Sequence, residues 1–437
     1  MDNSKYVIVN FDTFMKVMNV TLPICAMIAA PITGTLVQSG RRSAMMITSA
    51  IFMAGCMLSL IFNFFTIFIG RVIMGCCIGA YLTLVPLMVC ELSPGPISGP
   101  LGVVGQIQGM TGVLISSILQ FAQPYENDTL ALQSLMWKIT LGLPVLVCAI
   151  QITLLYFVFD FDSPRFHQIE DEDIRYRYAL KRQYYIPALK EDETTHLMMK
   201  EEDRLPFAKV RDITWAEVFS APYYRAMLVG AFFAFFHQAS GINSITFVSN
   251  QLFTRNVDQI DMEYYSRAGA FLTGVAGLLA AIAGFLLSHC FGRRFIILVG
   301  LTLMIVILGV LSNTALLHYD EIGKVCNALY AFAFNASLGS ILWLYVSETN
   351  GPKSISVAAV TSSASTLLFM LITEKVFNIF TEVGIYFNLS FFQVTAIGFM
   401  YIFLKETRGC PDKEKLYWPE EVKTESHDEP RELEDLS

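Results

Sequence analysis

The chain has 437 residues, of which 54% are hydrophobic and only 16% are charged. A water-soluble domain does not need so large an apolar fraction, so the composition indicates a polytopic membrane protein. The formal net charge of −8 gives no reason to expect nucleic acid as a partner.

The residues that usually carry catalysis or bind metals form no recognisable pattern. Nine cysteines lie mostly inside apolar runs, with neither metal-ligand spacing nor the pattern of a disulfide scaffold. We interpret them as small buried hydrophobic residues. Gly-rich phosphate loops, zinc spacings and nucleophile elbows are absent from the sequence. We therefore predict no enzymatic activity, no metal site and no cofactor.

Eleven stretches are long and apolar enough to cross a bilayer as helices, which takes about 20 residues each. Five precede a long polar interval and six follow it. They lie near 14–37, 43–62, 65–90, 100–121, 137–159, 224–252, 267–289, 295–316, 324–347, 355–376 and 386–404. The pattern predicts an all-α membrane protein with a five-span bundle at 14–163 and a six-span bundle at 223–405.

Positively charged residues predict the orientation of these spans, because cytoplasmic loops are rich in Lys and Arg. With strict alternation, the basic loops all fall on one side, which we assign to the cytoplasm. Residues 1–13 are then an external segment, and they lack the features of a signal peptide. The loop at 164–222 is cytoplasmic, with short helices expected at Asp173–Gln183 and Glu191–Asp203. The acidic segment 406–437 is expected to be a disordered cytoplasmic tail.

The stretch 232–253 reads FFAFFHQASGINSITFVSNQLF and places His237, Gln238 and Asn243 inside an otherwise apolar span. Polar groups at bilayer depth usually face the bundle interior or a watery cavity. On an ideal helix Gln238 and Asn243 lie about 140° apart. Unwinding at Gly241 would bring both toward one cavity, as in the broken helices of transporters. Hydrogen bonding between helices is the alternative role for these side chains.

Two short patterns occur once in each part of the chain. Arg41 and Arg42 follow a Gly between two apolar segments, and Arg293 and Arg294 do the same 252 residues later. Glu91, followed by Gly-Pro, is matched by Glu348, also followed by Gly-Pro. The repeats suggest a duplicated bundle around one central site, in which the first half has one helix fewer than the second.

A series of motifs runs in order along the chain from about Phe14 to Gly409. It comprises Gly40-Arg41-Arg42, Gly70-Arg71, Val85-Pro86 with Glu91, Gln106 with Thr111-Gly112, Asp162-Ser163-Pro164-Arg165-Phe166, Gln238-Ala239-Ser240-Gly241-Ile242-Asn243, Gly292-Arg293-Arg294, Trp343 with Glu348, and Glu406-Thr407-Arg408-Gly409. On these motifs the chain resembles the sugar porter family of the major facilitator superfamily. The resemblance implies a two-bundle fold in which the counterpart of the family's first helix is absent.

The resemblance also implies roles for individual residues. Gln106, Gln238 and Asn243 match positions that hydrogen-bond sugar hydroxyls, and Trp343 matches a tryptophan that packs on the sugar. His237 stands where a second glutamine is usual, and Asn335 where a glutamate is usual. The substrate-binding set predicted in this way is Gln106, His237, Gln238, Asn243, Asn335 and Trp343.

Charged residues at the predicted cytoplasmic ends suggest a gate. Arg41, Arg42, Arg293 and Arg294 are expected to pair with Glu91, Glu348 and Asp162, joining the two halves when the site faces outward. Arg165 and Lys353 extend this set. The alternative is that the arginines serve only to hold their loops in the cytoplasm.

We therefore predict a multi-pass plasma-membrane carrier that moves a monosaccharide by alternating access, without proton coupling. Its expected partners are a small sugar and the lipid bilayer. Two alternatives stay open at this stage: a sugar sensor that does not transport, and a proton-coupled carrier of another polyol. An imidazole at His237 offers a group that could make transport sensitive to pH, and the alternative is a neutral histidine that shares a hydrogen bond.

Overall fold

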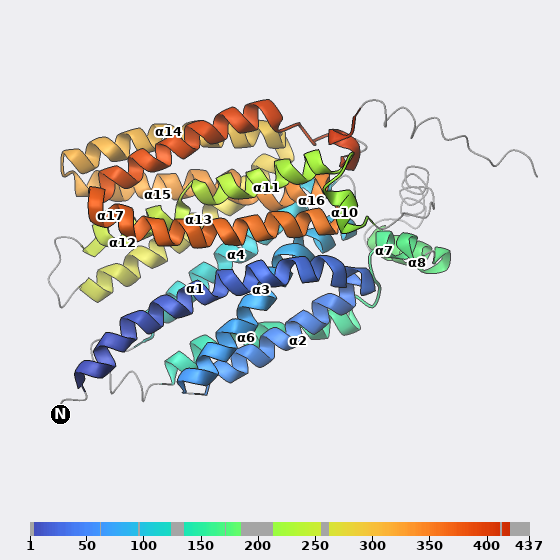
Figure 1. Ribbon diagram of the computed structural model, residues 1–437, viewed down its shortest axis with the longest axis horizontal. Helices are drawn as coiled ribbons and strands as arrows, with labels where there is room; N and C mark the ends of the chain where they lie inside the picture. Colours follow the sequence, from blue (N-terminus) through green and yellow to red (C-terminus); the bar gives the residue numbers. More distant parts are fainter. Residues whose placement is uncertain are drawn as a thin grey trace, which may run out of the picture.

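The computed structural model describes residues 4–61, 63–94, 97–123, 135–170, 172–184, 213–254, 262–410 and 413–419. Within these ranges the regular secondary structure is entirely helical. Figure 1 shows two bundles whose long helices run roughly along the longest axis of the molecule, one built from the first part of the chain and one from the second.

Each bundle is built from consecutive long helices. The first contains α1 (Ser4–Leu36), η1 (Val37–Ser39), α2 (Arg41–Ser59), α3 (Phe64–Leu92), α4 (Ser98–Phe121) and α6 (Met136–Phe157). The second contains α11 (Tyr224–Ala239), α12 (Ile242–Thr254), α13 (Met262–Cys290), α14 (Arg293–Leu316), α15 (Asp320–Ala336), α16 (Leu338–Thr349) and α17 (Pro352–Phe403).

In the described part of the chain, ten helices are long and apolar enough to cross a membrane. Two of them lie within α17, where Thr381 has non-helical backbone angles between spans at Pro352–Thr373 and Thr381–Phe403. The remaining expected span, near 224–252, is divided into α11 and α12. The expectation of an all-α, multi-pass membrane fold is confirmed. Helix α1 begins at Ser4, ten residues before the apolar stretch that predicted it.

The division between α11 and α12 lies at Gly241, where the sequence suggested unwinding. Gly241 has a φ of +73°, in the left-handed region that side chains rarely adopt. A Cβ at this position would also overlap the side chain of Leu389. The backbone turn is closed by the Gly241 N–H, which donates to the Gln238 carbonyl at 2.9 Å. Glycine is therefore required here both by the backbone and by the space available.

Four short helices gather at one end of the molecule, where α1 ends and α2 begins (Figure 1). They are α7 (Pro164–Ile169), α8 (Asp173–Tyr184), α10 (Trp215–Val218) and the 3-10 turn η3 (Glu414–Tyr417). The helix expected at Asp173–Gln183 is α8. The one expected at Glu191–Asp203 lies outside the described residues.

The start of the acidic tail differs from the expectation of disorder. Residues 406–410 and 413–419 are ordered against the second bundle, and Tyr417 is buried there. Its hydroxyl lies 2.6 Å from the hydroxyl of Tyr345 on α16. The prediction was wrong for these residues. Their acidic composition indicated disorder, but one short aromatic segment packs against the second bundle. Residues from 420 onward lie outside the described part of the chain.

The two bundles approach each other closely at glycines. Cβ atoms built on Gly274 of α13 would lie 3.1 Å from the backbone of Leu114 on α4, and Gly34 of α1 packs directly on Ser356 of α17. In lipid, helix association depends on such close packing of small residues. These two contacts hold the bundles side by side and leave α3, α4 and α16 facing one another in the centre.

We expect Gly241→Ala to destabilise the protein, because alanine there requires a strained backbone and displaces Leu389. A non-glycine residue at positive φ costs about 1–3 kcal/mol before any clash is counted. The unfolding temperature of the purified protein in detergent should fall clearly. Gly398→Ala is the matched control, since Gly398 lies in α17 with open space around its Cβ position. Equal unfolding temperatures for the two variants would contradict this account of the break.

Candidate functional site

A cavity of about 280 Å³ lies between the two bundles, with walls from α3 and α4 of the first and α16 of the second. The residues that line it are Ile78, Tyr81, Leu82, Val85, Pro86, Val89, Gly102, Gly105, Gln106, Gly339, Ser340, Trp343 and Ser347. None of these carries a charge. The walls are largely apolar with an amide, an indole and a few hydroxyls, which is the usual chemistry of a small-molecule site.

Gln106 connects the two bundles at this cavity. Its Nε2 donates to Oδ1 of Asn335 on α15 at 2.9 Å. Asn335 is itself fixed, because its Nδ2 donates to the Ala331 carbonyl at 2.8 Å. Among the described residues the Oε1 atom of Gln106 has no hydrogen-bond partner. The pair therefore holds the amide in one orientation and leaves an acceptor for a ligand hydroxyl.

Trp343 forms the part of the wall contributed by α16. It is partly buried and lies one turn beyond Gly339, where a Cβ would come within 3.1 Å of Gln106 Nε2. The missing side chain lets α16 approach the amide. An indole offers a flat apolar face and one N–H donor, which suits the mixed surface of a sugar ring.

The other expected binding residues do not line this cavity. Gln238 donates from Nε2 to the hydroxyl of Ser362 at 3.2 Å. The His237 ring packs 4.9 Å from the ring of Phe334, and its Nδ1 is buried with no hydrogen-bond partner among the described residues. Asn243 is exposed on the far side of the Gly241 break. The structure therefore brings together Gln106, Asn335 and Trp343, while His237, Gln238 and Asn243 are not among the residues that line this cavity.

The charged residues form one compact cluster in the first bundle. Arg41 donates from Nε and Nη2 to the two carboxylate oxygens of Glu91, at 3.1 and 3.2 Å. Asp162 accepts from the backbone N–H groups of Arg41 and Arg42 at the start of α2, each at 3.2 Å. Ser163 donates its hydroxyl proton to Glu91. The Asp162 carboxylate thus caps the positive end of α2, while burial raises its pKa against these bonds.

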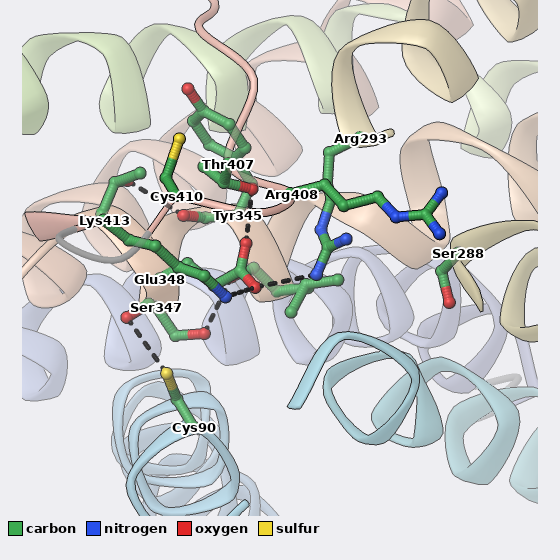
Figure 2. Close-up of polar contacts among 12 residues, drawn as sticks. Cys90, Ser288, Arg293, Tyr345, Ser347, Glu348, Thr407, Arg408, Cys410 and Lys413 are labelled. Carbon is green, nitrogen blue, oxygen red and sulfur yellow. Dashed lines mark hydrogen bonds and ion pairs between the residues drawn. The ribbon is translucent and has the colours of Figure 1, made fainter. Parts of the chain in front are cut away.

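The second bundle repeats the arrangement with different residues (Figure 2). Arg293 donates to Glu348 at 3.0 Å, and Thr407 donates to the other oxygen of Glu348 at 2.6 Å. Glu406 accepts from the backbone N–H groups of Arg293 and Arg294 at 2.9 and 3.1 Å. Each residue has a counterpart in the first cluster, so the duplication read from the sequence extends to the hydrogen bonds.

These ion pairs lie within each bundle, whereas the sequence suggested that they join the two. The reason is local, because each arginine begins a helix whose neighbours supply the carboxylates. Lys353 likewise donates to the Ile213 carbonyl. Contacts between the bundles at this end include Arg293, whose guanidinium packs against Gly99 of α4, and Arg165, which pairs with Glu414 through both carboxylate oxygens. The Cys90 thiol of α3 also lies 3.5 Å from the Ser347 carbonyl of α16.

The Arg165–Glu414 pair joins the loop after the first bundle to the tail after the second. The Arg165 and Glu414 side chains are 30% and 43% exposed, so solvent weakens the pair. Burial alone would raise the pKa of Glu414, but the Arg165 charge outweighs it and the pKa is lowered. Next to this pair, Lys413 donates to Glu348 at 2.6 Å. The tail thus contacts Arg165, in the loop after the first bundle, and Glu348, in the charged cluster of the second.

Sequence reasoning gave no role to Glu406, Thr407, Lys413 or Glu414. The first two carried a usable signal, because Glu406-Thr407 follows the last span of the second bundle as Asp162-Ser163 follows that of the first. The partners of Lys413 and Glu414 depend on how the tail folds back, for which the sequence contains no local pattern.

Three comparisons place the chain among known proteins. The family described as "Sugar (and other) transporter" matches residues 11–414. The chain is 24% identical to Hexose transporter 1 of Toxoplasma gondii, over 92% of this chain and 73% of that protein. It is 25% identical to the glucose transporter GlcP of Staphylococcus epidermidis, over 88% and 84%. The solved structure of the proton:xylose symporter XylE bound to 6-bromo-6-deoxy-D-glucose superposes with a TM-score of 0.77 at 18% identity, covering 93% of this chain and 90% of XylE.

We expect Glu348→Ala to destabilise the protein strongly, because it leaves Arg293 buried without its carboxylate. Removing one partner of a buried pair costs about 3–5 kcal/mol. Denaturant or thermal unfolding in detergent measures the loss. Glu321→Ala is the control, since its pair with Lys324 is 86% exposed on the Glu321 side. A Glu348→Ala loss no larger than that of the control would contradict the structural role of the cluster.

Glu414→Gln should have a much smaller effect on global unfolding, about 0–1 kcal/mol, because the pair with Arg165 is partly solvated. Its effect should instead be local. Amide hydrogen exchange of residues 413–419 should become faster, while exchange in α16 stays unchanged. Unchanged exchange in the tail would contradict a role for the Arg165–Glu414 pair in holding η3 in place.

Proposed function

The chain belongs to the sugar (and other) transporter family of the major facilitator superfamily, and from this premise we propose that it moves a hexose-like monosaccharide across the membrane by alternating access. Members of this family are carriers and not enzymes. The relatives named above include hexose, glucose and xylose transporters, which is why we propose a monosaccharide and not a larger solute.

One observation carries the proposal, namely the neutral cavity between the bundles. Gln106 and Trp343 both line it, and Asn335 holds Gln106 by a hydrogen bond. A sugar offers hydroxyl groups that exchange hydrogen bonds with amides, together with an apolar ring face for an indole. A charged solute would leave its charge unpaired in these walls, at a high cost in free energy.

The absence of charge in the described cavity walls also favours transport without proton coupling. A proton-coupled cycle needs a titratable group whose protonation state changes with the direction the site faces. Glu91 and Glu348 are each engaged in an arginine pair, and neither lines the cavity. We therefore propose facilitative transport, although the structural neighbour XylE is named a proton symporter.

The proposed cycle rocks the bundle at 14–163 against the bundle at 223–405 around the cavity. The Arg165–Glu414 pair and the contact of Arg293 with Gly99 would break when the site opens toward the end that carries them. The positive charges at that end support a cytoplasmic location for it. We propose the plasma membrane as the location, since uptake of external sugar requires it there.

Flux through purified protein tests the proposal. Proteoliposomes should take up radiolabelled D-glucose saturably, L-glucose should not compete, and the flux should equilibrate without an imposed proton gradient. Flux that requires the gradient would favour the proton-coupled alternative. Stereoselective binding without flux would favour the sensor, and no binding of any hexose would refute the proposal.

We expect Gln106→Ala to weaken substrate affinity about five- to 150-fold, since an unpaired polar partner costs about 1–3 kcal/mol. The half-saturation concentration in the same flux assay measures this change. Asn313→Ala, which removes an exposed amide on α14, is the control and should transport like the unmodified protein. A Gln106→Ala variant with unchanged kinetics would move the site away from this cavity.

A further inference from the structure

A second cavity, of about 490 Å³, lies in the second bundle between α11, the end of α17 and the η3 segment. It shares no residue with the cavity around Gln106. Its chemistry is divided along its length, because cations and aromatic side chains stand at the η3 end and apolar side chains extend from there along the helices.

The apolar part of the wall is open to the surroundings. Leu228 and Phe232 on α11 are 42% and 47% exposed, and Ile402 and Phe403 on α17 are 71% and 51% exposed. Ile402 and Phe403 lie in the candidate membrane span Thr381–Phe403, so the open apolar side of the cavity is suited to contact acyl chains.

Two cations stand beside η3. The Lys405 Nζ donates to the Leu416 carbonyl at 3.1 Å and lies 5.4 Å from the centre of the Tyr417 ring. Arg225 donates from Nε to the Tyr224 hydroxyl at 3.1 Å. In the described part of the chain, no carboxylate forms an ion pair with either residue. Both cations are exposed beside an apolar slot, and among the described residues neither charge has an ion-pair partner.

We propose that this cavity binds one anionic phospholipid of the cytoplasmic leaflet. Its phosphate lies between Arg225 and Lys405, and its acyl chains lie along Leu228 and Phe232. Basic pockets between membrane helices on the cytoplasmic side recognise anionic headgroups. Trp418 and Tyr224 supply the amphipathic rings that favour the headgroup level.

The bound lipid also stabilises the docked tail, because η3 forms one wall of the cavity. Tyr417 and Trp418 line it, while Lys413 and Glu414, directly before them, contact Glu348 and Arg165. A lipid that orders this wall therefore favours the contact between the loop after the first bundle and the tail. This inference does not depend on the identity of the transported solute.

Native mass spectrometry of the full-length protein tests the lipid site. Phosphatidylglycerol should bind roughly 25-fold more tightly than phosphatidylcholine. Each of the two cations contributes a factor of about five, from its electrostatic attraction to the anionic headgroup. The double variant R225Q/K405Q should lose this preference. The control K138Q removes a lysine that lies over Trp137 in the first bundle and should retain it. Equal affinity for the two lipids, or a preference that survives in R225Q/K405Q, would overturn the proposal.

Hydrogen exchange of the unmodified protein in nanodiscs provides a second readout that needs no variant. Residues 413–419 should exchange more slowly with phosphatidylglycerol present than with phosphatidylcholine alone. Inorganic phosphate added to phosphatidylcholine nanodiscs should give no such protection. Protection by phosphate alone would overturn the lipid assignment in favour of a free-anion site, and no protection by either would overturn the link to the tail.

Discussion

The structure depends on two buried carboxylates that must each be matched by an arginine. Arg41 is 1% exposed and Glu348 is 3% exposed, at the ends of bundles that are otherwise apolar. A buried charge without its partner is too costly to persist, so these pairs restrict how the helices meet. Arg41 and Glu91 fix α2 against α3, and Arg293 and Glu348 fix α14 against α16. Helices α3 and α16 are also walls of the central cavity, so the pairs at the bundle ends position the site.

The two halves use this device in parallel but not identically. In both, a carboxylate caps the helix that begins with the arginine pair, and a hydroxyl from the same segment donates to the buried glutamate. In the second half the glutamate also accepts from Lys413 (Figure 2). Glu414, the neighbour of Lys413, pairs with Arg165. The duplicated core is therefore extended by a tail that contacts the other half. This asymmetry gives the tail a part in holding the two bundles together at one end.

Much of this was accessible from the sequence, because it is encoded locally. Each span is a continuous apolar run, and the paired motifs at Arg41 and Arg293 predicted the duplication and pointed to the residues of the two buried ion pairs. The sequence could not predict in which direction the side chains on either side of Gly241 point. The turn at Gly241 has a φ of +73°, so the helical angle between Gln238 and Asn243 says nothing about where they point after it. The docking of Tyr417 on Tyr345 depends on a fold-back that composition does not encode.

The placement of strong and weak interactions fits a molecule whose halves move as units. A rigid-body motion leaves contacts inside each half intact and breaks those between them. The buried pairs, each worth several kcal/mol to retain, lie inside the halves. The Arg165–Glu414 pair between them is 30% and 43% exposed, where water readily replaces either partner. Had the buried arginines bridged the halves instead, as the sequence suggested, separating the halves would leave an unpaired charge buried in the protein interior. In the proposed cycle, keeping the costly pairs within each half avoids that barrier and leaves the weaker Arg165–Glu414 pair between the halves.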